Sequence, residues 1–207
     1  MKKLIAALAG LLALSCAWAD EVIAPDVLVR NVTDEVLTIV RQDKDIQKGD
    51  SAKTVQLVET KVLPNFDFER MTALAMGKDW RGASPAQKGT LVEEFRTLLV
   101  RTYSKALTEY RNQTMTIKLF RMQPDNSDAR VRAKVNQPGG KSILIDYDLE
   151  KKDSAWKVYD ISVDGISLVT NYRSSFGQEV SANGIDGLIK QLHDKNQGAA
   201  APAATKR

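Results

Sequence analysis

Apolar residues recur every three or four positions through the first half of the chain, which predicts amphipathic helices. The first helix should begin at Pro25, because the fixed φ of proline suits a first helical turn. A second helix should be capped by Asp50 or Ser51. A short third helix should run from the N-cap Asp67 to Gly77, since glycine accepts the left-handed conformation that ends many helices.

The strongest helical pattern starts at Ser84. Ser84-Pro85-Ala86-Gln87 has the form of a capping box with proline in the first turn. An apolar stripe follows at helical spacing, and Tyr103 and Leu107 widen it, so this helix should be covered on more than one side. The stripe comprises Leu91, Phe95, Leu98, Leu99, Thr102, Ala106 and Tyr110.

After Asn112 the apolar period changes to two, which predicts strands over residues 116–122, 129–135, 143–150 and 155–164. The last strand changes phase in its middle. A bulge near Tyr159-Asp160 would return its apolar residues to one face. Two helices should close the chain, one over residues 166–182 and one after Asp186.

The second and third strands flank Pro138-Gly139-Gly140 and should form a hairpin. A register centred on Gly140 places opposite charges together on one face and apolar residues together on the other. The charged pairs would be Lys134 with Asp146, Arg132 with Asp148 and Arg130 with Glu150. The apolar pairs would be Val135 with Ile145, Ala133 with Tyr147 and Val131 with Leu149.

These patterns predict an α+β fold. An antiparallel twisted sheet of about four strands would carry helices on one face, with its other face charged and wet. The shape expected is cystatin-like or NTF2-like. Residues 20–197 suit a single domain, and residues 198–207, rich in alanine, should form a disordered tail.

The N-terminus has the form of a signal peptide over residues 1–19. Lys2 and Lys3 precede a short apolar stretch, and Ala17-Trp18-Ala19 supplies a small-x-small cleavage site. An uncleaved membrane anchor and acylation at Cys16 are the alternatives. Cleavage after Ala19 would give a soluble exported product and remove the one cysteine of the chain, so the mature chain could form neither a disulfide nor a thiolate metal site.

The charge balance gives no basis for nucleic-acid binding. The chain has 30 basic and 26 acidic residues, and they are dispersed rather than clustered. The carboxylates Asp146, Asp148 and Glu150 could form an acid–base or metal site, but their alternation along a strand favours a charge-paired, solvated face. His193 is the single histidine and should lie on the surface. No catalytic residue and no metal ligand is predicted.

Four polar residues near the end of the last strand have two readings each. Asp160 should make a bulge contact and Asp164 should cap a helix, and a ligand role is the alternative for both. Tyr172 and Arg173 could hold a phosphate at a pocket mouth, or they could be a core aromatic residue and a surface charge.

Two stretches resemble one family. Residues 158–176, VYDISVDGISLVTNYRSSF, and residues 67–103, DFERMTALAMGKDWRGASPAQKGTLVEEFRTLLVRTY, are similar to the hallmark segments of the toluene-tolerance or MlaC family. Members of that family are periplasmic carriers that move phospholipid between the two membranes of Gram-negative bacteria. The resemblance implies an apolar cavity between sheet and helices that holds acyl chains, whereas composition alone indicates an ordinary dry core.

The resemblance makes the apolar residues of the interior candidate lipid-binding residues. On the strands they are Val131, Ala133, Ile143, Ile145, Tyr147, Val158 and Val163. On the helices and the segment before the last helix they are Met71, Leu74, Met76, Leu98, Leu99, Tyr103, Leu168, Val169 and Tyr172.

The resemblance also implies partners. The protein would exchange lipid with an outer-membrane lipoprotein–porin complex and an inner-membrane ABC-type transporter complex, touching these membrane complexes transiently and using no cofactor. The alternative is a small periplasmic enzyme of NTF2-like shape, for which Asp160 with Tyr172 is the one available polar pair. An adaptor domain with a packed interior is a third hypothesis.

Overall fold

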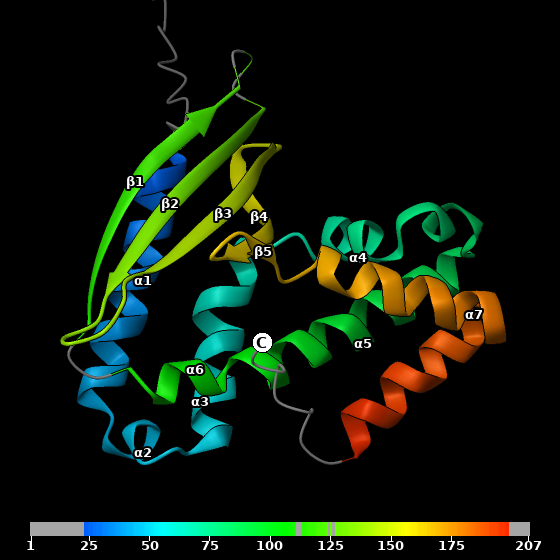
Figure 1. Cartoon of the computed structure of the whole chain (residues 1–207), viewed down its shortest axis with the longest axis horizontal. Coiled ribbons are helices and arrows are strands. Elements are labelled where there is room, and N and C mark those ends of the chain that lie inside the picture. Colours follow the sequence, from blue (N-terminus) through cyan, green and yellow to red (C-terminus); the bar gives the residue numbers. More distant parts are fainter. Residues whose placement is uncertain (1–22, 111–112, 124, 126, 199–207) are drawn as a thin grey trace, which may run out of the picture.

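The computed structural model describes residues 23–110, 113–123, 125 and 127–198 (Figure 1). The predicted signal peptide and nearly all of the predicted tail lie outside the described residues. Within the described part, no helix is both long enough and apolar enough to cross a membrane.

The predicted starts of the four helices in the first half of the chain are confirmed. Asp50 and Asp67 are N-caps, and Ser84 and Gln87 form the expected reciprocal capping box. The helical elements are α1 (Pro25–Gln42), α2 (Lys44–Gln47), α3 (Ser51–Leu57), the π-helix η1 (Val58–Val62), the 3-10 helices η2 (Leu63–Asn65), η3 (Gly77–Gly82) and η4 (Thr170–Tyr172), α4 (Phe68–Met76), α5 (Pro85–Tyr103), α6 (Lys105–Thr108) and α7 (Arg173–Gln197), which kinks at Gly184.

The strands form one antiparallel sheet in the order β1-β2-β3-β4-β5. They are β1 (Thr114–Met122), β2 (Asp128–Asn136), β3 (Ile143–Lys152), β4 (Ala155–Val163) and β5 (Ile166–Ser167). The predicted bulge in β4 is confirmed. Asp148 pairs with Asp160 while Leu149 pairs with Val158, so Tyr159 is the extra residue.

The fifth strand corrects the prediction of a helix from Ile166. Asp164 and Gly165 both have positive φ, as a two-residue type I′ hairpin turn requires. The chain therefore turns back as β5, and the helix begins only at Arg173. Asp164 does not cap a helix, because its carboxylate accepts a hydrogen bond from the Leu144 N–H at 3.0 Å.

The predicted β2–β3 register is wrong by two residues, although the assignment of faces is right. Pro138 and Gly139 occupy the centre of a tight turn in which the Gly140 N–H donates to the Gln137 carbonyl at 3.1 Å. This turn is shorter than one centred on Gly140, and a shift of two residues preserves which side each residue faces. The observed pairs are Lys134 with Leu144, Arg132 with Asp146, Arg130 with Asp148, Asp128 with Glu150, Val135 with Ile143, Ala133 with Ile145, Val131 with Tyr147 and Ala129 with Leu149.

The outer face of the sheet is charge-paired, as predicted. Arg130 donates to both carboxylate oxygens of Asp148, at 2.6 and 2.7 Å, and Arg132 does the same to Asp146. The hydrogen bond from Arg132 holds the pKa of Asp146 below its usual range. These carboxylates are therefore occupied by guanidinium groups rather than arranged as an acid–base pair.

Because the Arg132–Asp146 pair is bidentate and only partly exposed, Arg132→Ala should lower the free energy of unfolding by about 1–2 kcal/mol. Val131 on the inner face is fully buried, so Val131→Asp should prevent stable folding by placing a charge in an apolar interior. Urea denaturation of both variants measures the difference. A larger loss of unfolding free energy in Arg132→Ala than in Val131→Asp would show that the ion pairs of the outer face stabilise the fold more than the apolar inner face does.

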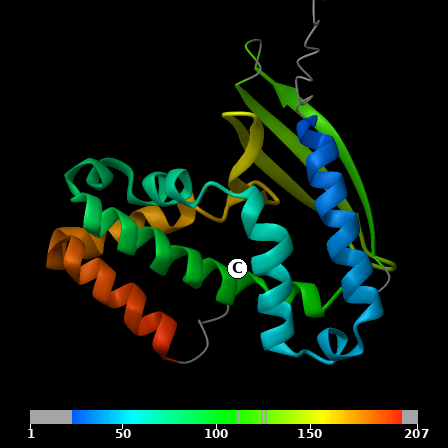
Figure 2. The same cartoon turned by 180° about the vertical axis from the view of Figure 1, so that it is seen from behind.

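The helices divide into two groups around the sheet. α1 crosses the inner face of the sheet, while α4, α5 and α7 pack against one another to one side of it (Figures 1 and 2). Each group has its own apolar core. Phe95, Leu91, Leu188 and Leu192 are fully buried in the cluster formed by α4, α5 and α7, hereafter the helical cluster. The predicted α+β fold, an antiparallel sheet with helices packed on one face, is confirmed. Within it, the helical cluster buries its apolar stripes mainly within itself.

Candidate functional site

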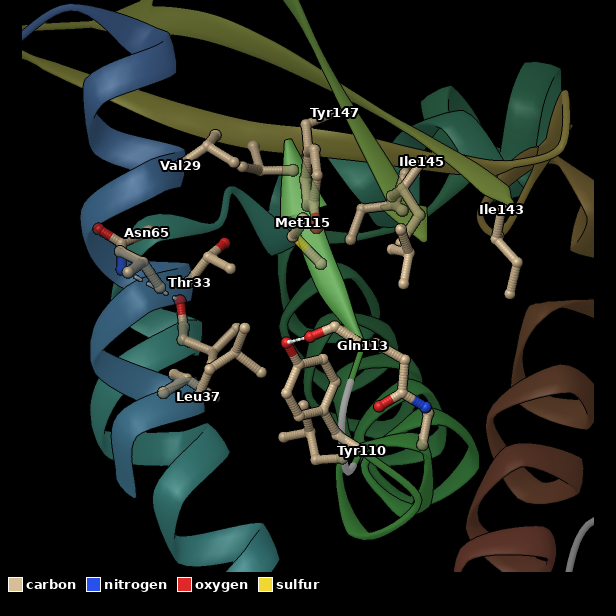
Figure 3. Close-up of a pocket in the computed structure, with 18 of the residues that line it drawn as sticks. Val29, Thr33, Leu37, Asn65, Tyr110, Gln113, Met115, Ile143, Ile145 and Tyr147 are labelled. Carbon is tan, nitrogen blue, oxygen red and sulfur yellow. Dashed lines mark hydrogen bonds between the residues drawn. The ribbon is translucent and has the colours of Figure 1, made fainter. Parts of the chain in front are cut away.

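An apolar cavity of about 480 Å³ lies between the inner face of the sheet and helix α1 (Figure 3). α1 contributes Leu28, Val29, Val32, Thr33, Val36 and Leu37. The sheet and its turn contribute Met115, Val135, Gln137, Ile143, Ile145, Tyr147, Val158 and Ile161. The remaining wall consists of Val62, Asn65, Phe66, Ala106, Leu107, Glu109, Tyr110 and Gln113.

The amphipathic stripe of α1 forms the helical wall of this cavity. Leu28, Val32 and Val36 recur every four residues, so they share one side of the helix. Near its start α1 is held to the sheet by Arg30, whose guanidinium donates to the Ile117 carbonyl at 2.6 Å. Further along, Val36 packs in a separate core with α2 and α3. Contacts at Arg30 and Val36 thus hold α1 in place, and Val32 between them faces the cavity.

A change of helix type shapes the second wall. α3 continues into the π-helix η1 and then into the 3-10 helix η2, which contains Pro64 and ends at Asn65. The Asn65 side-chain amide donates to the carbonyl of Lys61 at 3.0 Å and caps this end. Phe66 then forms a bridge to Val158 of β4, which brings its ring to the cavity.

The polar side chains of the wall gather mostly at one end of the cavity. The Tyr110 hydroxyl donates to the Gln113 carbonyl at 2.5 Å (Figure 3). It also accepts a hydrogen bond from Arg41 at 3.1 Å. Glu109 and Gln137 line the same end, near the α6–β1 link and the β2–β3 turn. The cavity therefore combines a long apolar interior with a polar end, which suits an elongated amphiphilic molecule.

Four of the predicted lipid-binding residues line the cavity: Ile143, Ile145, Tyr147 and Val158. Val131 and Ala133 lie on the same inner face but are fully buried in the core of the sheet. Val163 is close by on β4 without lining the cavity. Four of the seven strand residues predicted to bind lipid thus form part of the sheet wall of the cavity.

The predicted helical residues lie elsewhere. Eight of them belong to the helical cluster and are absent from the cavity wall, because α4 and α5 face α7 rather than the inner face of the sheet. They are Met71, Leu74, Met76, Leu98, Leu99, Tyr103, Val169 and Tyr172. The ninth, Leu168, lies on the segment after β5, where its N–H donates to the Ile161 carbonyl.

The α1 residues of the wall were missed as site residues by the sequence analysis. Their helical spacing was visible, and it correctly predicted a buried face. An apolar stripe does not reveal whether it packs against protein or borders a cavity, so the signal identified the helix but not its role.

The residues with two interpretations make contacts within the protein. The Tyr172 ring packs against Phe95 and Phe176, with centroids 5.2 and 5.5 Å away. Arg173 donates twice to the Leu74 carbonyl, at 3.0 and 2.8 Å, and so satisfies the last turn of α4. Asp160 accepts from the Ile161 N–H at 2.8 Å, and its burial raises its pKa.

The structure brings no catalytic group to the cavity from these candidates. Asp160 and Tyr172 are both absent from its wall. His193 lies on the surface as predicted, with its Nδ1 2.8 Å from a carboxylate oxygen of Glu94. Among the described residues, no three histidine, cysteine or acidic side chains come together as metal ligands would.

Comparison with known proteins supports one family. The model of the MlaC protein family matches residues 30–194. The intermembrane phospholipid transport system binding protein MlaC of Haemophilus influenzae is 26% identical over 82% of this chain and 80% of its own length. The toluene tolerance protein Ttg2D of Pseudomonas putida is 28% identical over 92% of this chain and 93% of its own length.

A solved structure has the same fold. It is described as the phospholipid-binding protein from Ralstonia solanacearum in complex with a phospholipid. The TM-score is 0.76 with 38% sequence identity, and the match covers 83% of this chain and 96% of the other.

Proposed function

This chain belongs to the MlaC family, and from that premise we propose that it is a phospholipid carrier that holds acyl chains in the cavity between α1 and the sheet. The observation that carries the proposal is the cavity itself. Its wall is apolar along α1 and the inner strands and polar at one end, in a chain that shares its fold with a phospholipid complex.

A carrier of this kind answers a physical need. A diacyl lipid in water exposes roughly thirty methylenes, and at about 0.8 kcal/mol each their hydration costs on the order of 20 kcal/mol. Transport between two membranes therefore requires an apolar container around the chains. The polar end with Glu109, Tyr110 and Gln113 would leave the head group near water, so selectivity among head groups should be weak.

We place this activity in the periplasm on the evidence of the predicted signal peptide and the family. The carrier would receive and deliver lipid at an outer-membrane lipoprotein–porin complex and at an inner-membrane ABC-type transporter complex. A carrier needs no catalytic group, and the candidate pair of Asp160 and Tyr172 lies outside the cavity wall. Energy for directional transport would come from the transporter complex rather than from this chain.

The mature protein, purified without added lipid, should carry diacyl phospholipid at close to one molecule per chain. The apolar cavity should retain its contents through purification, because releasing them would expose the chains to water. Denaturation, organic extraction and mass spectrometry measure the bound lipid. Protein that yields no lipid and takes none from vesicles would contradict the proposal, and a chemically altered lipid would indicate an enzyme instead.

A further inference from the structure

One tyrosine hydroxyl in the cavity lacks a protein partner. The chain has five tyrosines. Tyr110 is bonded as described above, Tyr103 and Tyr172 are neighbouring phenols in the helical cluster, outside the cavity, and Tyr159 lies beside the Arg70 guanidinium. Across the described parts of the chain, no group donates to or accepts from the hydroxyl of Tyr147. Burial alone raises the pKa of Tyr147 to about 12, without a contribution from any hydrogen bond or charge.

Tyr147 stands in the middle of the sheet wall. It lies on β3 between Val131 of β2 and Ile161 of β4, which are its partners across the sheet. Figure 3 shows its ring reaching from the sheet into the cavity. The hydroxyl at the end of the ring is thus presented to whatever fills the cavity.

Water can reach this hydroxyl in the unfilled cavity, but acyl chains that fill the cavity would displace that water and leave the hydroxyl unbonded, which is unfavourable. Thr33, which also lines the cavity, can avoid this loss by turning its hydroxyl toward the carbonyl one helical turn earlier. The oxygen of Tyr147 is fixed in the plane of its ring. Because Tyr147 lies on a strand, it has no carbonyl one helical turn earlier to which the hydroxyl could turn. A ligand that supplies an acceptor would therefore satisfy it.

The surroundings restrict the acceptor to an uncharged group. Among the described residues that line the cavity there is no lysine, arginine or histidine, and Glu109 is the one charged side chain. A phosphate beside Tyr147 would lose its hydration without gaining a cation. An ester carbonyl is neutral, accepts a hydrogen bond, and is attached directly to the acyl chains.

We propose that the Tyr147 hydroxyl donates a hydrogen bond to an acyl ester carbonyl of the bound glycerophospholipid and so fixes how deeply the lipid sits. This inference rests on the proposed carrier function and adds a specificity to it. The protein should bind ester-linked diacyl lipids in preference to ether-linked dialkyl lipids with the same chains and head group. The apolar walls should not favour the ester, since the two lipids have chains of equal length and the ether has a methylene in place of each ester carbonyl.

A competition experiment tests this specificity. Purified mature protein is stripped of lipid and incubated with vesicles containing equal amounts of dipalmitoyl phosphatidylglycerol and its dihexadecyl ether analogue. Mass spectrometry of the extracted protein gives the ratio of the two bound lipids. The wild-type protein should favour the ester by roughly two- to tenfold, the range of one net hydrogen bond.

Tyr147→Phe should bring this ratio to about one while total loading is retained. Tyr103→Phe is the matched control, because it removes a tyrosine hydroxyl outside the cavity, and it should keep the wild-type ratio. Comparing ratios between variants cancels any difference in how the two lipids leave the vesicles. The melting temperature of unloaded Tyr147→Phe should not fall, since the hydroxyl has no partner in the protein to lose.

Equal loading of both lipids by the wild type, or an unchanged preference in Tyr147→Phe, would overturn the hydrogen bond and leave the carrier function standing. A fall in the stability of unloaded Tyr147→Phe would also overturn it, by revealing a partner within the protein. Failure of every variant to take up either lipid would instead contradict the proposed carrier function.

Discussion

Ile145→Trp should reduce phospholipid loading by more than about tenfold while the protein remains folded. Ile145 lines the cavity from β3, and the added indole would occupy volume that acyl chains need. Open space accepts a larger side chain without the strain that overpacking causes in a filled core, which is about 1–3 kcal/mol. Lipid extraction measures loading, and a circular dichroism melt measures stability.

Leu99→Trp is the matched control. Leu99 was predicted from the sequence to face lipid, but it lies in the helical cluster with 7% of its surface exposed. The same substitution should therefore lower stability by about 1–3 kcal/mol and leave loading per folded molecule unchanged. The reverse pattern, in which Leu99→Trp blocks loading and Ile145→Trp destabilises, would mean that lipid lies between α5 and its neighbours.

Phe95→Ala should lower the free energy of unfolding by about 3–5 kcal/mol, as removal of a large buried aromatic side chain does. Phe95 is fully buried on α5, and the rings of Tyr172 and Phe176 pack edge-on against it at 5.2 and 5.3 Å. Those two rings would lose their shared partner. Urea denaturation, monitored by tryptophan fluorescence, measures the change in the free energy of unfolding.

Phe120→Ala provides the comparison for the same substitution at an exposed place. Phe120 lies on β1 with 50% of its surface exposed, and the Arg132 guanidinium lies 3.8 Å from the centre of its ring. Its removal should therefore cost about 1 kcal/mol or less. Molecules of Phe95→Ala that remain folded should still load lipid, because among the described residues of the cavity wall only Phe66 packs against the helical cluster. Loss of loading at temperatures where this variant is folded would show that the helical cluster supports the cavity directly.

Features that depend on neighbouring residues could be predicted from the sequence. The N-caps Asp67 and Ser84 bond backbone groups three residues away, so the signal and its partner lie in the same short stretch. The inner and outer faces of β2 and β3 follow from alternation, since successive side chains of a strand point to opposite sides. The bulge at Tyr159 was visible as a change of phase for the same reason.

Features that depend on which surfaces meet were decided by the tertiary structure. The turn at Pro138-Gly139 set the β2–β3 register, because a shift of two residues satisfies both faces almost equally well. The type I′ turn at Asp164-Gly165 added β5 where the apolar spacing resembles a helix.

The location of the cavity was decided in the same way. The stripes of α1 and α5 are both apolar and periodic, and the sequence determines that each must be buried. It does not determine that α5 is covered by α7 while the middle of α1 faces a cavity. Burial of a stripe is a local requirement, whereas the identity of its cover depends on the packing of segments distant in the chain.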